Sequence, residues 1–274
     1  MFIRSFTILL STFLFANLAF APPATAAQCG GDFNVFLGAM AREAQSAGVS
    51  RAVIDESFAG LTVDQKVLRF DRIQHRAFRR EGSFEKFAST RVIPARIKRA
   101  KKLMQRHAKL LASVERQYGV PAAVLMSIWT LESDNGTGDI GKMSVVRTLA
   151  TMAHDCRRTE LFQRELIAAL QIVQRGDLPL RDMKGAFAGE LGQTQFLPSS
   201  YIKYGVDYDG NGHVDLRHSV PDVLASTANL LKVNGWQAGQ PYGDGTDNFQ
   251  VLREWNRSEI YRKTIVLLAE RIES

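Results

Sequence analysis

Apolar residues recur at helical spacing along most of this chain, and that periodicity constrains its fold more than any other feature. One face of a long helix is predicted by Ile97, Ala100, Met104, Leu111, Val114 and Tyr118, which lie three, four or seven residues apart. Further helices are predicted over residues 33–47, 121–132, 159–174, 220–234 and 252–272. Helix ends are indicated by Gly119, Gly176 and Gly235. Because strand patterns are weak throughout, the sequence predicts a mainly α-helical fold.

The chain of 274 residues is long enough for one enzyme core with extensions or for two small domains. We expect an N-terminal helical region over residues 28–115 and a core over 116–235. A linker and a C-terminal helix that packs back on the core are expected over 236–274. Glycine-rich loops are predicted at 135–141, 185–192 and 205–212.

The first 27 residues are typical of a secretory signal peptide. Arg4 precedes an apolar stretch from Phe6 to Phe20, and the small residues APPATAA follow, with cleavage expected near Ala26 or Ala27. The apolar stretch is too short to span a membrane comfortably. We therefore expect an exported protein that is soluble after cleavage and has no stable membrane anchor.

Cys29 and Cys156 are the only cysteines of the sequence. In an oxidising compartment an even pair predicts one disulfide, which would close a long loop and stabilise the fold by about 4–5 kcal/mol through loop-closure entropy. Two free thiols are the alternative. We do not expect a lipid on Cys29, because Gln28 stands where lipoprotein processing needs a small residue.

The formal charge is +7, and the excess of positive charge is concentrated in one part of the chain. Residues 66–116 contain 16 Lys and Arg against four acids. A basic exported protein favours a polyanionic partner. Export argues against nucleic acid, whereas peptidoglycan with its acidic stem peptides fits. A solvated helix face accounts for the same charges.

Glu132 is placed at the end of an otherwise apolar helical stripe that contains Val124, Leu125 and Ile128. Burial there would raise the pKa of the carboxyl group, as a general acid working near neutral pH requires. The Asn-Gly pair at 135–136 should end the helix and leave Glu132 at the edge of a cleft. The alternative is that Glu132 pairs with an arginine or caps a turn.

The segment GAFAGELGQTQFLPSSY, residues 185–201, follows about 55 residues later and contains a Gly-x-x-Gln-x-x-Pro pattern. Its glycines at 185, 189 and 192 would allow the backbone to approach a bulky ligand. Gln193 and Gln195 provide donors and acceptors that suit sugar hydroxyl and acetamide groups. A plain loop-to-helix turn would also explain this segment. Glu190 in the same loop is a second carboxylate that could assist, although we expect no role for it.

Taken together, these residues resemble the membrane-bound lytic murein transglycosylase B family. The resemblance runs from Phe33 to Ile272, and its motifs occur in the order and spacing of the family. The matching motifs are VPAAVLMSIWTLES around Glu132, DNGTGDIGK, TLATMAHD, KGAFAGELGQTQFLPSSY, DYDGNGHVDL, ASTANLLKVNGW and EWNRSEIY.

The resemblance implies a lysozyme-like catalytic core and cleavage of the β-1,4 bond between N-acetylmuramic acid and N-acetylglucosamine, which leaves 1,6-anhydro-muramyl ends. Glu132 matches the single catalytic glutamate, which acts first as acid and then as base without a cofactor, because the substrate supplies its own nucleophile. The resemblance further implies a periplasmic location, peptidoglycan glycan strands as the substrate and other cell-wall enzymes as candidate partners. We expect a monomer.

Substrate-binding residues are implied by the same resemblance at Gln195, Gln193, Asn229, Trp255, Asn256 and Tyr201. Three positions depart from the family pattern. Ala186 replaces an expected serine, Leu230 replaces a tyrosine, and Trp255 stands where a tyrosine is expected. These departures put substrate preference and rate in doubt and leave the central acid in place.

An acidic loop resembles the start of an EF-hand, with metal ligands predicted at Asp207, Asp209, Asn211, His213 and Asp215 and the sharp turn at Gly212. The twelfth position should be a bidentate glutamate but is His218, which should weaken the binding of Ca²⁺. We expect either a structural Ca²⁺ or Na⁺ here or a metal-free turn rich in Asp and Asn.

Two other functions remain open. A non-catalytic peptidoglycan-binding scaffold of the same fold is suggested by the changes at Ala186 and Leu230, although the retained Glu132 argues against it. A hydrolytic muramidase would use water, and the absence of an evident second carboxylate argues mildly against that activity.

Overall fold

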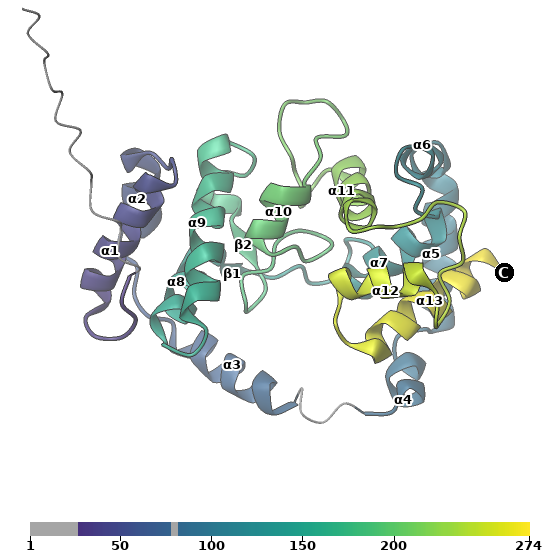
Figure 1. The fold of residues 1–274 in the computed structure, drawn as a ribbon, viewed down its shortest axis with the longest axis horizontal. Coiled ribbons are helices and arrows are strands. Elements are labelled where there is room, and N and C mark those ends of the chain that lie inside the picture. Colours follow the sequence, from purple (N-terminus) through teal and green to yellow (C-terminus); the bar gives the residue numbers. More distant parts are fainter. Residues whose placement is uncertain (1–26, 78–81) are drawn as a thin grey trace, which may run out of the picture.

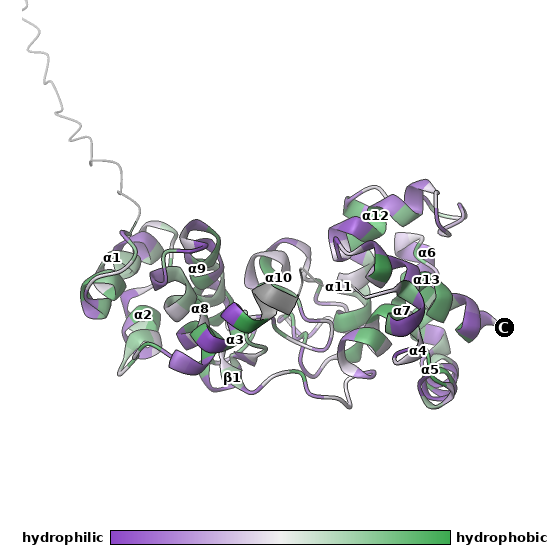
Figure 2. Ribbon diagram, turned by 90° about the horizontal axis from the view of Figure 1, so that it is seen from below, coloured by the Kyte–Doolittle hydropathy of each residue, from purple (hydrophilic) through white to green (hydrophobic). Residues whose placement is uncertain are grey.

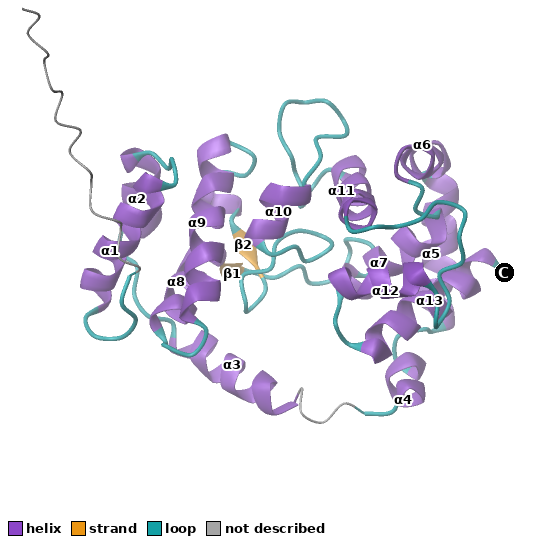
Figure 3. Cartoon of the chain, in the orientation of Figure 1, coloured by secondary structure: helices purple, strands orange, loops and turns teal. Residues whose placement is uncertain are grey.

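The computed structural model describes residues 27–77 and 82–274, with side chains described outside 74–81. The predicted signal peptide therefore lies outside the described residues except for Ala27. Figure 3 shows helices joined by loops, with one small pair of strands near the middle of the molecule.

The described residues form helices along most of their length. The elements are α1 (Phe33–Ser46), α2 (Arg51–Phe58), α3 (Gln65–Ala77), α4 (Phe84–Ser89), α5 (Pro94–Arg106), α6 (Ala108–Tyr118), α7 (Ala122–Ser133), β1 (Met143–Ser144), α8 (Val145–His154), α9 (Thr159–Arg175), the short 3-10 helix Leu180–Asp182, β2 (Lys184–Gly185), α10 (Pro198–Tyr204), α11 (Val220–Val233), α12 (Asp247–Trp255) and α13 (Glu259–Glu273). The mainly α fold predicted from periodicity is thus confirmed.

The helices gather into two groups with α10 and the strand pair between them (Figure 1). In one group, α8 packs on α9, and α1, α2 and α3 pack against these two helices. In the other, α7 contacts α5, α6, α11 and α13. The segment before residue 115 therefore contributes helices to both groups, and the boundary near that residue stays a prediction.

Helix α7 is buried nearly all round, because four other helices pack against it. The sequence predicted a single buried stripe, whereas Ala123 to Thr130 are all buried. A helix that is hydrophobic on every side belongs in a core rather than on a surface. Figure 2 shows hydrophobic green ribbon where α7, α11 and α13 converge. The C-terminal helix α13 thus packs back on the core, as expected.

Two predicted helices are each divided in the structure. The periodic run over 97–118 forms α5 and α6, which are separated at His107. The run over 252–272 is divided between α12 and α13, because Asn256 Oδ1 accepts the amide of Ser258 at 2.9 Å. Ser258 in turn caps α13 by accepting the amide of Tyr261. Side-chain capping, which a hydrophobic period does not reveal, causes the second break.

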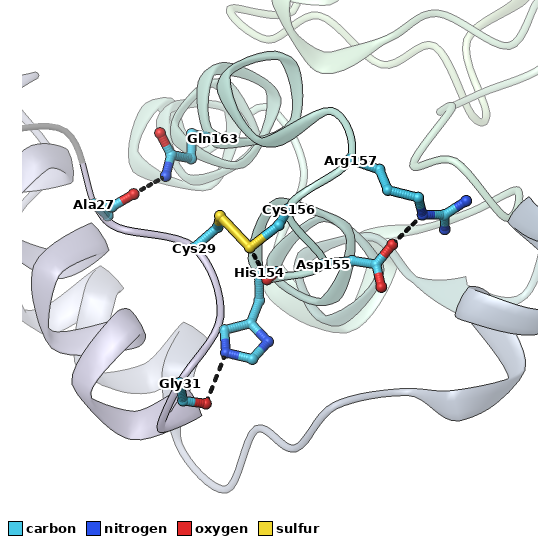
Figure 4. Close-up of a disulfide and its surroundings, with 8 residues drawn as sticks. All are labelled: Ala27, Cys29, Gly31, His154, Asp155, Cys156, Arg157 and Gln163. Carbon is cyan, nitrogen blue, oxygen red and sulfur yellow. Dashed lines mark hydrogen bonds and ion pairs between the residues drawn. A yellow bond between two sulfur atoms is a disulfide. The ribbon is translucent and has the colours of Figure 1, made fainter.

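Cys29 and Cys156 form the predicted disulfide, with 5.2 Å between their Cα atoms and a sequence separation of 127 (Figure 4). The bond ties the segment before α1 to the end of α8. Two hydrogen bonds support the same connection. Gln163 Nε2 donates to the carbonyl of Ala27, and a ring nitrogen of His154 lies 3.2 Å from the carbonyl oxygen of Gly31.

None of the helices in the described part of the chain is both long enough and apolar enough to cross a membrane.

Candidate active site

A cavity of about 370 Å³ opens beside the C-terminal end of α7. The glycine-rich loop between β2 and α10 forms one wall, and the end of α12 forms another. Its lining combines carboxylates and amides with apolar and aromatic side chains, namely Glu132, Ala186, Phe187, Glu190, Thr194, Gln195, Phe196, Leu197, Ser200, Leu230, Glu254, Trp255 and Asn256. This mixture suits a sugar, which presents both polar edges and apolar faces.

The carboxyl group of Glu132 is held at one oxygen by two donors. Trp255 Nε1 donates to Oε1 at 3.0 Å, and the hydroxyl of Tyr261 donates to the same atom at 2.7 Å. Among the described residues, none donates a hydrogen bond to the other oxygen, Oε2. Oε2 is therefore the atom that can carry a proton toward the cavity.

Burial raises the pKa of Glu132 above its ordinary value. The hydrogen bonds from Tyr261 and Trp255 act in the opposite direction, and the nearby charge of Glu190 raises the pKa further. Burial is the largest of these effects, so the carboxyl group retains its proton to a higher pH than a solvated glutamate does. A general acid requires this property.

The two donors are themselves fixed by aromatic packing. The Tyr261 ring lies 6.0 Å from that of Phe87 in α4, and the Trp255 ring meets Phe196 edge-on at 5.4 Å. Burial, followed by the charge of Glu132, raises the pKa of Tyr261 well above its ordinary value, so the hydroxyl remains a donor. The orientation of Glu132 therefore depends on α4, α12, α13 and the glycine-rich loop together.

Gln195 lies in the cavity wall with a backbone conformation that is rare for its residue type. Its φ is +55°, in the left-handed region that favours glycine. Its Nε2 donates to the carbonyl of Gly192 at 2.8 Å. Residues other than glycine adopt this backbone conformation at a cost in free energy, and strained residues of this kind cluster at functional sites. The strain at Gln195 therefore agrees with a role in binding.

The glycines at 185, 189 and 192 were predicted to allow a ligand to approach, but protein fills the space beside each of them. A Cβ at Gly185 would lie 1.9 Å from the carbonyl oxygen of Glu190, and one at Gly189 would lie 2.5 Å from Leu149. At Gly192 the obstacle is the carbonyl of Leu216. These glycines therefore permit tight packing of the loop on the core, which in turn fixes the cavity wall.

The six predicted substrate-binding residues divide into two sets. Gln195, Trp255 and Asn256 line the cavity. Gln193, Asn229 and Tyr201 are not part of its lining, and their side chains bond to protein at other places. Gln193 accepts from Trp129 Nε1 and donates to the carbonyl of Arg217, both at 2.8 Å. Asn229 donates to the carbonyl of Tyr204 at 2.9 Å, and Tyr201, only 1% exposed, donates to that of Val214.

Sequence reasoning missed two groups of this site. Tyr261 ends the motif EWNRSEIY, which carried part of the family resemblance, but it received no role. Glu190 was noted as a carboxylate that could assist but was expected to have no role, although it lines the cavity with Glu132. All three departures from the family pattern, Ala186, Leu230 and Trp255, also lie in the cavity wall.

The acidic loop brings carboxylate oxygens of Asp207, Asp209 and Asp222 within 4.8 Å of one another. Asp222, in α11, was absent from the prediction, and the carboxylate of Asp215 does not belong to this group. The backbone carbonyl of His213 stays a predicted ligand. Asp207 also accepts the backbone amides of residues 210, 211 and 212. The donor set of hard carboxylate oxygens fits Ca²⁺.

Residues 32–246 match the protein family described as Transglycosylase SLT domain. The chain belongs to the transglycosylase SLT domain family. This result confirms the resemblance inferred from the sequence motifs.

The chain is also similar to individual proteins, by sequence and by structure. Membrane-bound lytic murein transglycosylase B of Escherichia coli K12 is 40% identical over 124 residues, which are 44% of this chain. The match spans about a third of that relative, 34% of its length. SltB3 from Pseudomonas aeruginosa, solved with NAG-anhNAM-pentapeptide, is 30% identical with a TM-score of 0.82 over 89% of this chain and 80% of that one.

Escherichia coli Slt35, solved with calcium, has a TM-score of 0.77 at 23% identity over 93% of this chain and 98% of that one, and so shows a shared fold. The lysozyme-like architecture that the resemblance implied is thereby confirmed for this member of the transglycosylase SLT domain family.

Proposed function

We propose that this protein is a lytic transglycosylase that cleaves the β-1,4 bond between N-acetylmuramic acid and N-acetylglucosamine in peptidoglycan. The observation that carries the proposal is the state of Glu132. Its carboxyl group has a raised pKa, is fixed at Oε1 by two donors and presents Oε2 to a cavity of sugar size.

In the proposed reaction, Glu132 gives its proton to the glycosidic oxygen, which leaves C1 with the bonding electron pair. The C6 hydroxyl of the same muramyl sugar then attacks C1 and returns its proton to Glu132. The product is a 1,6-anhydro ring, and no water is consumed. One carboxyl group suffices for both proton transfers, whereas glycoside hydrolysis uses a pair of carboxyl groups.

Gln195, Trp255 and Asn256 are the candidates for holding the sugar, because they line the cavity around Glu132. Crystal structures of SltB3 contain NAG-anhNAM-pentapeptide and NAG-NAM-pentapeptide, which are peptidoglycan fragments with and without the anhydro end. The similarity to SltB3 supports the same class of substrate for this chain.

We further infer that the protein works outside the cytoplasmic membrane, where its substrate lies. The leader-like sequence of residues 1–27 and the disulfide between Cys29 and Cys156 support an exported, oxidising location such as the periplasm. A monomeric state and contacts with other cell-wall enzymes stay predictions.

For the acidic loop we infer a structural cation held by Asp207, Asp209 and Asp222, with Ca²⁺ favoured by the all-oxygen donor set. The calcium complex of Slt35, which shares the fold, supports this assignment. The ion would join the loop to α11 and would take no part in the reaction.

Digestion of purified sacculi by the wild type and by Glu132→Gln tests the proposal, with muropeptides identified by mass spectrometry. The glutamine keeps an acceptor for Trp255 and Tyr261 but has no proton to give. Anhydro ends from the wild type alone are the expected result. Reducing ends would indicate hydrolysis, and binding without any product from either protein would indicate a scaffold.

A further inference from the structure

Glu190 is a second carboxylate in the cavity of Glu132, and the reaction described above does not use it. It lies in the glycine-rich loop, whereas Glu132 lies at the end of α7. The two are close enough that the charge of Glu190 acts on Glu132. A carboxylate beside a developing cation stabilises it far more strongly in a cavity from which water is excluded than in bulk water.

The backbone holds Glu190 in a defined position. The amide of Ala186 donates to the carbonyl of Glu190 at 3.0 Å, and that carbonyl lies where a side chain on Gly185 would be. The following residue, Leu191, pairs with both Gly185 and Phe196. The loop therefore presents the Glu190 side chain from a braced backbone, as a preorganised catalytic group requires.

One oxygen of the Glu190 carboxylate is anchored and the other is available. The amide of Ala188 donates to Oε2 at 3.0 Å. No side chain of a described residue donates a hydrogen bond to Oε1, and this atom is not among the buried unpaired polar atoms, so it is accessible in a residue that lines the cavity.

The surroundings also allow Glu190 to be ionised when Glu132 is protonated. Burial raises the pKa of Glu190, while the backbone amides and the positive charge of Arg158 lower it. Arg158 is 49% exposed and also pairs with Asp71. In contrast, Glu132 has no basic residue among the influences on it. The backbone amides and the positive charge of Arg158 thus favour the ionised form of Glu190, and no basic side chain does the same for Glu132.

We propose that Glu190 is a second catalytic residue whose carboxylate stabilises the positive charge that develops at C1 of the muramyl sugar. This inference rests on the proposed transglycosylase function. Glu190 forms no bond in the reaction. The bond from C1 to the glycosidic oxygen breaks, the C6 oxygen bonds to C1, and both proton transfers use Glu132.

The charge of Glu190 has a second consequence for the pH dependence of activity. Tyr261 and Trp255 contact Glu132 directly, Arg91 and Arg96 lie near Tyr261, and the exposed Glu254 lies at the cavity edge. Within this set, Glu190 is the acid whose charge raises the pKa of Glu132. Its neutralisation should lower that pKa, so the alkaline limb of the pH profile of kcat should move to lower pH.

The test compares Glu190→Gln with the wild type in the full-length, disulfide-bonded protein, using solubilised glycan strands of defined length. Glutamine keeps an acceptor for the Ala188 amide, so the loop should stay folded, which circular dichroism and thermal unfolding verify. Glu56→Gln removes an equal charge from an exposed site on α2 and serves as the matched control. Glu190→Asp, which restores the charge, is the rescue variant.

We expect kcat of Glu190→Gln to fall at least about tenfold with little change in KM, together with the shift of the alkaline limb. Partial recovery is expected in Glu190→Asp, and activity within about twofold of wild type in Glu56→Gln. Equal kcat in Glu190→Gln and wild type would overturn the inference, as would a loss confined to KM. The inference would also be overturned if Glu190→Gln lost only the products with reducing ends. Glu190 would then activate water for hydrolysis.

The same digests keep the two proposals distinguishable. The transglycosylase function is judged from the chemical nature of the ends that the wild type produces. The role of Glu190 is judged from the ratio of rates between the variant and the wild type, whichever ends are formed.

Discussion

The hydroxyl of Tyr261 donates to Oε1 of Glu132 across 2.7 Å, although 129 residues separate the two in sequence. The contact exists because α13 packs along α7 and returns the C-terminal part of the chain to the end of the core helix. Tyr261 acts on the carboxylate in two ways. It fixes the orientation of the side chain, and as a donor it favours the ionised form.

Replacing Tyr261 by phenylalanine should therefore change both the rate and the pH profile. Loss of the donor leaves Trp255 alone to orient Glu132, and we expect kcat to fall about tenfold. Because the lost hydrogen bond favoured the charged form, the pKa of Glu132 should rise, and the alkaline limb should move to higher pH. This direction is opposite to the one expected for Glu190→Gln.

Initial rates measured across a pH series would check this prediction. Tyr242→Phe provides the matched control, because it loses a similar hydrogen bond, to Glu273, far from the cavity. An unchanged profile in Tyr261→Phe would show that the contact has no influence on the acid.

A pair of variants at Gln195 separates backbone strain from substrate binding. Both Gln195→Gly and Gln195→Ala remove the amide from the cavity, so each should raise KM about fivefold. Only glycine adopts a φ of +55° freely. The glycine variant should therefore have a free energy of unfolding about 1 kcal/mol higher than the alanine variant. Urea denaturation measures the difference, and equal stabilities would argue against strain at this residue.

The sequence predicts a residue of this site when the role of that residue depends on its neighbours in the chain. It does not predict residues that reach the site through the packing of distant helices. Glu132 was predicted because its helix, its apolar neighbours and its Asn-Gly stop are contiguous in sequence. Tyr261 was not assigned a role, because its contact arises from the packing of α13 on α7. Gln193 and Gln195 have equal chemistry, and only the backbone conformation of the loop determines which one faces the cavity.

The same distinction holds for the fold. Gly119 and Gly176 end their helices with φ of +76° and +74°, as their positions predicted. The break between α12 and α13 was not predicted, because it depends on the side chains of Asn256 and Ser258. Asp222 was not predicted as a metal ligand, because it lies in α11 and not in the acidic loop.

Removing the disulfide should destabilise the protein without altering the cavity. Its 127-residue separation makes the loop long, so the double variant Cys29→Ser, Cys156→Ser should lose about 2–5 kcal/mol of unfolding free energy. Dithiothreitol should lower the stability of the wild type and leave that of the double variant unchanged. If dithiothreitol left the stability of the wild type unchanged, the disulfide would contribute nothing to that stability.

Calcium should raise the thermal midpoint of the wild type by about 5 °C at saturation, because an ion that binds only the folded state stabilises it. The response should disappear in Asp222→Asn and persist in Asp55→Asn, an exposed acid on α2. Differential scanning calorimetry with EGTA and with added Ca²⁺ provides the measurement. A midpoint that does not respond in the wild type would leave the acidic loop as a metal-free turn.

The account depends most on a carboxyl group that keeps its proton because the fold withdraws it from water. Carbon-detected NMR titration of Glu132, labelled at the side-chain carboxyl, measures this property directly in the substrate-free protein. A short unstructured peptide that contains one labelled glutamate provides the reference under the same conditions. We predict that Glu132 titrates at a distinctly higher pH than the glutamate of the peptide, because burial raises its pKa. A Glu132 that ionises together with the peptide glutamate, or before it, would contradict the proposed role as the acid.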